Sequence, residues 1–365
     1  MALSSMLSPA QRIGRIKGEI LSHAIPREVL GLIGDSKPMP KNSGDTVIFR
    51  RWLPVNATAG GPLTSYAGPN NFFSPTETGD RTQTLANQHL SSEGVTPAAE
   101  TLTPQDITVT MNEYTVLFGY TKRTADLYED DVPGAMKMQT GERLALVREL
   151  VRFGVIKGCT NKFYGGTGTS RATVNGKPTL KLLRKITRAL DQQHTDKVTE
   201  ILSASPKYGT SAVEAGYFVF IHTDLKADFR DMAGFVPVAR YGSMKTVSPY
   251  EFGTIEEFRI IASPELVSVI NAATSTTAAT YNLVSTGDTY PDVYQMVVAG
   301  RDAWGDIALR GAKSLDVHDL KPGQIDKNDP TGQRGYIGAS CYYNAVLLNS
   351  FHMAVAEVGA SVLND

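Results

Sequence analysis

The sequence predicts an α+β protein in which strand-rich and helix-rich segments alternate, so that at least one domain is discontinuous. Two amphipathic helical patterns and several short, strongly apolar strand patterns carry this prediction. A third observation is a connection of 50 residues, 56–105, between two predicted strands. Loops in compact domains are typically about 4–6 residues long, so this connection needs its own explanation.

The two strands that flank this connection are Asp45–Val55 and Asp106–Phe118. In the second strand Ile107 and Val109 alternate with polar residues, which is the period of a half-buried strand. The connection itself has 27 Gly, Pro, Ser, Thr or Asn residues and no Ile, Met or Lys. It cannot bury enough apolar surface on itself to offset its ordering entropy. Either it is disordered or another molecule supplies its contacts, and the second interpretation predicts a protein that embraces its neighbours.

Composition bounds the class of protein. The chain is 41% hydrophobic and 20% charged, and its 36 Lys and Arg residues balance its 37 Asp and Glu residues. This balance argues against a protein built for tight nucleic-acid binding, which needs a surplus of cations. Two cysteines without a CxxC motif fit a reducing cytoplasm. The absence of a signal peptide and of a long apolar run predicts a soluble protein kept inside a cell.

Two helical patterns come first along the chain. A short basic amphipathic helix is predicted after Ser8-Pro9, either docked on its own domain or laid on a neighbour. A longer helix is predicted from Thr140, with an apolar stripe that includes Leu144 and Leu150. Arg143, Glu149 and Arg152 are placed on its other face. That face would be solvated in a monomer and would meet other subunits in an assembly.

A further helix, Thr179–His194, buries Leu183, Ile186 and Leu190 and is locally basic. Its cations are Lys177, Lys181, Arg184, Lys185 and Arg188. A solvated charged face is the default interpretation, and a weak contact with nucleic acid is the alternative.

Strand patterns occupy much of the rest: Tyr217–Ile221, Glu251–Ser263, Tyr294–Ala299, Gly335–Asn349 and His352–Val358. The first strand is followed by a predicted helix with Thr223 or Asp224 as its N-cap.

The chemistry-bearing residues form no known catalytic pattern. The glycine-rich segment Phe163–Lys177 fails the P-loop spacing and the dinucleotide-binding spacing, which favours a turn. A metal site could be drawn at His222 with Asp224, Asp228 and Asp231, but a capped helix with solvated acids explains these residues better. We therefore predict no catalytic residue, no cofactor and no metal ligand.

Six segments in order resemble the major capsid proteins of tailed bacteriophages with the Hong Kong 97-type fold, most closely the podovirus-like branch. These segments are DTVIFRRWLPV, DITVTMNEY, GERLALVRELVRFGVIKGCTNKFYGG, YFVFIHTDLKADFRDMAGFVPVARYG, EFGTIEEFRIIASPEL and DPTGQRGYIGASCYYNAVLLN. Together they span most of the chain.

The resemblance implies an N-terminal arm, an extended E-loop, a P-domain with a long spine helix and an antiparallel sheet, and an A-domain whose sheet is flanked by helices. The implied layout is the arm at 1–44, a strand pair at 45–118 carrying the E-loop at 56–105, the P-domain at 119–165 with the spine helix at 140–162, the A-domain at 166–245 and 285–310, the P-domain sheet at 246–284, and its C-terminal strands at 311–365. An E-loop without lysine excludes a covalent cross-link from that loop. The lack of a long N-terminal scaffolding segment suggests a separate scaffolding protein or none.

The function that the resemblance implies is a structural subunit, not an enzyme, that assembles into the icosahedral head of a tailed double-stranded DNA phage. Its partners would be copies of itself in pentamers and hexamers, together with portal, scaffolding and decoration proteins, with weak contacts to packaged DNA and none to a membrane. It would be assembled in the bacterial cytoplasm and reside in the virion. The candidate subunit-interface residues are Phe72, Phe73 and Arg81 in the E-loop, Arg143, Glu149 and Arg152 on the helix, and Asp329 and Arg334 at the P-domain rim.

Two rival functions remain open. A nanocompartment shell of the encapsulin kind would share the fold and enclose enzymes instead of a genome. A cytoplasmic α/β enzyme would use the 50-residue connection as an active-site lid, and it would show a pocket of titratable groups with shifted pKa values.

Overall fold

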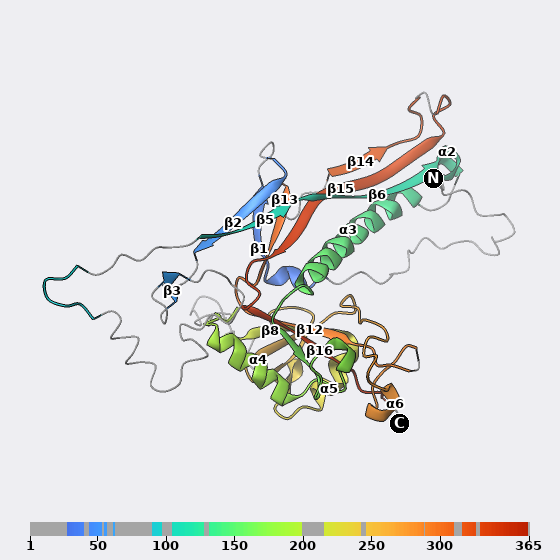
Figure 1. Cartoon of the computed structure of the whole chain (residues 1–365). Coiled ribbons are helices and arrows are strands. Elements are labelled where there is room, and N and C mark those ends of the chain that lie inside the picture. The colour runs from blue at the N-terminus through green and yellow to red at the C-terminus, as the bar shows by residue number, and fades with distance from the viewer. Residues whose placement is uncertain are drawn as a thin grey trace, which may run out of the picture.

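The computed structural model describes residues 28–39, 44–52, 55–56, 61–62, 90–96, 104–127, 131–198, 215–241, 246–287, 289–309, 316–325 and 329–363. Two sheets and one long helix form the body of this part of the chain (Figure 1). The helix expected after Ser8-Pro9 and most of the 56–105 connection lie outside the described residues.

The first sheet has seven strands in the order β7-β16-β12-β8-β11-β10-β9. Their bounds are β7 Lys162–Tyr164, β8 Tyr217–Ile221, β9 Val236–Pro237, β10 Glu251–Ile255, β11 Phe258–Ala262, β12 Tyr294–Ala299 and β16 Met353–Val358. Strand β11 pairs with β8 in parallel and β7 pairs with β16 in parallel, while the other pairs are antiparallel.

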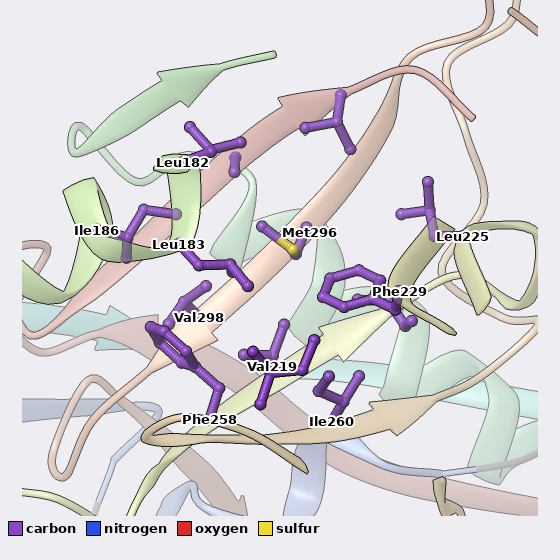
Figure 2. Packing of buried hydrophobic residues seen from close by; sticks show 14 of the residues in the cluster. Leu182, Leu183, Ile186, Val219, Leu225, Phe229, Phe258, Ile260, Met296 and Val298 are labelled. Carbon is purple, nitrogen blue, oxygen red and sulfur yellow. The ribbon is translucent and has the colours of Figure 1, made fainter. Parts of the chain in front are cut away.

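Every residue of β8, β11, β12 and β16 is buried. One face of these strands packs under α4 (Leu180–Gln192) and α5 (Lys226–Arg230), where Val219, Ile260 and Met296 meet Leu183 and Phe229 (Figure 2). The other face contributes to a second core, which includes side chains such as Phe220 and Trp304. Burial on both faces explains why these strands are mostly apolar, with Arg259, Gln295 and Glu357 as buried polar exceptions.

Helix α4 confirms the helix predicted over Thr179–His194. The Thr179 hydroxyl caps its first turn by accepting a hydrogen bond from the Leu182 backbone N–H. The turn η4 (Thr223–Leu225) precedes α5, and the expected cap there is wrong: His222 Nδ1, not Thr223 or Asp224, accepts the Asp224 backbone N–H at 3.2 Å.

The second sheet has five strands: β1 Asp35–Met39, β6 Asn112–Thr121, β13 Trp304–Leu309, β14 Asp316–Leu320 and β15 Arg334–Leu347. The long strand β15 is its centre. It pairs with β6 along one edge, and with β14 and then β13 along the other. Strand β1 adds to β13 in parallel.

Helix α3 (Val132–Ile156) covers one face of this five-stranded sheet, as Figure 1 shows. The prediction of a helix over 140–162 is right for its centre and wrong at both ends. The helix begins earlier because the Asp131 carboxylate accepts the Gly134 N–H at 3.0 Å and Pro133 suits the first turn. It ends before Lys162, where β7 starts.

A two-stranded ribbon projects from the body, formed by β2 (Thr46–Trp52) and β5 (Pro104–Thr110) in antiparallel pairing (Figure 1). Met111 separates β5 from β6, so the single strand expected over Asp106–Phe118 is two strands in different sheets. The remaining elements are η2 Leu30–Leu32, β3 Val55–Asn56, β4 Gly61–Pro62, α2 Lys122–Leu127, η3 Arg171–Thr173, η5 Val238–Arg240 and α6 Ala278–Tyr281.

The expected grouping of strands into two domains is wrong for several of them. Strands β10 and β11 were expected in the P-domain sheet, and β16 was expected beside β15 in the same domain. All three lie in the seven-stranded sheet. Conversely, β13 lies in the five-stranded sheet, and β1 ties part of the expected arm to that sheet. The physical reason is that an apolar pattern predicts a strand but does not specify which strand it pairs with.

Candidate assembly surfaces

Glu149 and Arg152 lie one turn apart on α3 and are 1% and 3% exposed. Glu149 Oε1 accepts the backbone N–H groups of Val29 and Leu30, each at 2.9 Å. Arg152 Nε donates to Asp306 Oδ2 on β13 at 2.8 Å, its Nη1 pairs with Glu28, and its guanidinium lies 5.4 Å from the centre of the Tyr343 ring. We call Glu28, Glu149, Arg152, Asp306 and Tyr343 the α3 charge cluster.

The α3 charge cluster corrects the expectation that Glu149 and Arg152 lie on an exposed helix face. Both side chains point into the body and tie the N-terminal segment and β13 to the helix. Leu150, expected in the buried stripe, is instead 45% exposed. Helical spacing defines a set of faces, but an isolated helix pattern cannot show that a buried charge has partners on other elements. A contact of these two residues with another subunit stays a prediction.

Burial sets the electrostatics of this cluster. It raises the pKa of Glu149, and the N–H groups of Leu30 and Val29 and the charge of Arg152 offset part of that rise. Burial alone would lower the pKa of Arg152, but Asp306, Tyr343 and Glu28 outweigh it and raise that pKa above its ordinary value. The guanidinium therefore stays charged, and it compensates carboxylates that would otherwise be buried without a cation.

Arg143 is exposed on α3, as the sequence predicts. Its guanidinium lies 5.3 Å from the centre of the Phe118 ring on β6, which is cation–π geometry. Its role between subunits stays a prediction.

Asp329 and Arg334 lie in the turn that leads into β15. The Asp329 carboxylate accepts the Arg334 backbone N–H at 2.7 Å, and the Gly332 N–H donates to the Asp329 carbonyl. The N–H of Gln333, with that of Arg334, lowers the pKa of Asp329. Asp329 therefore shapes the turn, whereas the Arg334 side chain is exposed. Contacts of this turn with a neighbour stay a prediction.

Phe72, Phe73 and Arg81 lie outside the described residues. Their assignment as E-loop contacts stays a prediction.

Two exposed apolar surfaces were missed by sequence reasoning. The first is the ribbon outer face, formed by Ile48, Arg50, Trp52, Asp106 and Thr108. Ile48 and Trp52 are each 60% exposed, and a bidentate Arg50–Asp106 pair at 2.7 and 2.8 Å lies between them. The inner face of the ribbon, with Phe49 and Val109, packs on Ile307 and Val346. Period-two alternation predicts that a ribbon has two faces, but not that the second face also carries large apolar groups.

The second is the open sheet face, on the side of the five-stranded sheet opposite α3. It is formed by Leu117 on β6, Leu320 on β14, and Tyr336 and Tyr342 on β15. Leu117, Leu320 and Tyr342 are 47%, 42% and 37% exposed. Large apolar groups gathered on an exposed surface mark sites where another molecule binds.

The described residues hold no group of three or more His, Cys, Asp or Glu side chains placed to bind a metal. In the same part of the chain, no helix is both long enough and apolar enough to span a bilayer.

Comparisons with known proteins show which proteins share this sequence pattern and this fold. No family model matches the chain. The major capsid protein of Pseudomonas phage KPP21 is 20% identical over 268 residues, which cover 68% of this chain and 66% of that protein. The chain thus spans about two thirds of the length of this curated relative.

Solved structures give a broader match. The capsid of Ralstonia phage GP4 aligns with a TM-score of 0.65 at 12% identity, covering 99% of this chain and all of that one. The capsid of cyanophage P-SCSP1u aligns with a TM-score of 0.56 at 14% identity over 96% and 94% of the two chains. The chain has the fold of phage capsid proteins, a mixed helix-and-sheet fold. The resemblance to phage major capsid proteins seen in the sequence is confirmed.

Proposed function

We propose that this protein is the major capsid subunit of the icosahedral head of a tailed double-stranded DNA phage. The observation that carries the proposal is a capsid fold that aligns over nearly the whole chain. The relative with detectable sequence identity is also a major capsid protein. A nanocompartment shell would share this fold, so it is the sequence similarity to a phage protein that favours the capsid function over that rival.

The mechanism follows from the two exposed apolar surfaces. A shell places one polypeptide in five-fold and six-fold rings, so each subunit needs several contact surfaces that work together. The ribbon outer face and the open sheet face offer two such surfaces on different elements. Many modest contacts closed by symmetry hold a wall together through effective concentration, so no single bond has to be strong.

The finer parts of the function are proposals on the same basis. The 56–105 connection acts as an extended loop over an adjacent subunit, the five-stranded sheet with α3 acts as the P-domain, and the seven-stranded sheet acts as the A-domain. Assembly takes place in the bacterial cytoplasm with portal, scaffolding and decoration proteins as partners. The subunit works as a structural component of the virion without catalysis.

Electron microscopy of the expressed protein tests the proposal. We expect closed shells or capsomers, formed alone or with a co-expressed scaffolding protein. A variant lacking residues 60–100 should remain folded by circular dichroism and fail to assemble. A wild-type protein that stays monomeric at high concentration under all these conditions would refute the capsid function. A deletion variant that still closes shells would refute only the role of the loop.

A further inference from the structure

Helix α4 carries four cations on one exposed stripe: Lys181, Arg184, Lys185 and Arg188. Their spacing of three, four and seven residues places them on the same side of the helix, over about 10 Å at 1.5 Å per residue. All four are exposed, whereas Leu182, Leu183, Ile186 and Leu190 on the other side are buried in the seven-stranded sheet's core. We call these four residues the α4 cationic stripe.

The stripe lines a cleft of about 580 Å³ between α4 and the loop that follows β7. Tyr164 and Gly166 contribute to its wall, and all four cations contribute to its lining. No aspartate or glutamate is found among the described residues that line this cleft. The cleft is therefore a concave surface of one charge sign, which concentrates anions locally.

The four positive charges of the stripe repel one another, and other residues of the chain offset only part of this repulsion. Lys181 and Lys185, and likewise Arg184 and Arg188, are like charges four residues apart, which destabilises a helix. Among the described residues, only Arg184 of the four has an ion-pair partner, Glu256 at 2.5 Å, and the side chains of that pair are 64% and 36% exposed. Lys185 Nζ lies 5.6 Å from the centre of the Phe163 ring, which holds it at the cleft. A bound polyanion would relieve the remaining repulsion.

The spacing of the charges suits a phosphate backbone. Double-stranded DNA carries about one charge per 3.4 Å of its axis on each strand, so a stripe about 10 Å long runs past about three phosphates of one strand. Contacts of this kind position DNA without reading its sequence, as a container for any genome requires. An acidic protein segment would instead bind through apolar anchors in buried pockets. Leu182, the aliphatic side chain in the lining, is 8% exposed and already belongs to the core.

We propose that the α4 cationic stripe binds the phosphate backbone of the packaged DNA and therefore faces the interior of the shell. This inference rests on the proposed capsid function and adds a location for DNA contact. It is compatible with a net charge of −1 for the whole chain, because a local surface can be cationic while the total charge is near zero.

Salt-dependent DNA binding by unassembled subunits tests the stripe. The variant Lys181→Glu with Arg188→Glu changes two stripe cations that form no ion pair within the described part of the chain. The matched control, Lys122→Glu with Arg123→Glu, makes the same charge change at exposed positions on α2, far from α4 (Figure 1). We expect the slope of log K against log salt to fall in magnitude by about 1.8 in the stripe variant, because each phosphate contact contributes about 0.9. At 0.1 M salt this corresponds to roughly 60-fold weaker binding, and the control should bind like the wild type.

An unchanged slope in a folded stripe variant would overturn the inference, as would an equal loss in the control. If charge reversal unfolds the subunit, Lys181→Gln with Arg188→Gln replaces it, with the same expected change in slope. A stripe variant that keeps DNA binding but loses an acidic protein partner would also overturn it.

Closed shells complete the test and separate it from the proposed function. DNA added to closed wild-type shells should not reach the stripe, and stripe-dependent binding to closed shells would overturn the interior location. A wild-type protein that forms no shells refutes the capsid function. If all variants form shells and bind DNA with the same affinity as the wild type, this inference is refuted and the capsid function stands.

Discussion

The two sheets of this protein differ in how completely the chain covers them. In the seven-stranded sheet the strands β8, β11, β12 and β16 are buried at every position, under helices on one face and a second core on the other. In the five-stranded sheet β14 is exposed at every position, and α3 covers a single face. One region closes its own core, and the other leaves large apolar groups at its surface.

This difference shows where the fold is self-sufficient and where it needs a partner. An antiparallel sheet with one solvated face normally carries polar residues there. The open sheet face instead presents Leu117, Leu320 and Tyr342, and the ribbon outer face presents Ile48 and Trp52. The cost of exposing these groups is offset only if another molecule covers them, which in a shell is a second copy of the chain.

The largest effect is expected in the self-sufficient region. Phe229 of α5 is fully buried against the seven-stranded sheet (Figure 2). Phe229→Ala should lower the free energy of unfolding by about 3–5 kcal/mol because it removes a large side chain and leaves a cavity. Val317→Ala on β14, where the side chain is 63% exposed, should change it by no more than about 0.5 kcal/mol. Chemical denaturation of both variants measures the contrast, and similar losses would show that β14 is covered within the subunit.

A comparable effect is expected at the α3 charge cluster. Arg152→Met should cost about 3–5 kcal/mol, because Asp306 and Glu149 would remain buried without their cation. Arg143→Met on the same helix is the matched control. It removes an exposed guanidinium that lies over Phe118, so it should cost about 1 kcal/mol or less. Equal denaturation midpoints for the two variants would mean that the cluster does not anchor the N-terminal segment to the helix.

A smaller, pH-dependent effect is expected where the ribbon meets the body. His352 lines a cavity of about 220 Å³ together with Phe49, Ile107 and Leu348. Burial lowers the pKa of His352 below 6.5, so the unfolded chain binds a proton there more readily than the folded chain does. The contribution is present above pH 6.5 and is lost as the pH falls through the folded pKa, with a slope of at most about 1.4 kcal/mol per pH unit. His352→Gln should flatten the stability profile between pH 7 and pH 5, and an unaltered profile would contradict this assignment.

Sequence reasoning succeeded where local pattern decides the structure. The cap at Thr179 and the apolar stripe of helix α4 can be read from its sequence, β8 is a continuous apolar run, and β12 is apolar except for Gln295. It failed where the outcome depends on partners distant in sequence. Glu149 has the pattern of a solvated charge, and its burial depends on partners distant in sequence, such as the backbone N–H of Val29, 120 residues away.

The same limit applies to strand pairing and to exposed surfaces. Strand β11 was placed in the wrong sheet because nothing in its residues specifies β8 as its neighbour. The two exposed apolar surfaces are harder still to predict, since Ile48 and Trp52 look like ordinary strand residues. The packing of Phe49 and Val109 on Ile307 and Val346 shows that the inner face of the ribbon is covered and the outer face is exposed. An alternating pattern predicts two faces, and the tertiary structure decides which of them is covered.

The smallest effect on the subunit, and the sharpest test of the comparison, is expected on the ribbon outer face. Ile48→Thr with Trp52→Thr keeps strand-forming residues at two positions that are 60% exposed, so the free energy of unfolding should change by about 1 kcal/mol or less. Phe49→Thr on the same strand is the matched control. It removes a side chain packed on Ile307 and should destabilise the subunit by about 2 kcal/mol or more. The double variant should stay folded and lose shell assembly in sedimentation and electron microscopy, because the surface it changes is apolar area that a neighbour covers. Shells formed at wild-type yield by the double variant would remove the ribbon outer face from the list of subunit contacts and leave the open sheet face as the surface that a neighbour must cover.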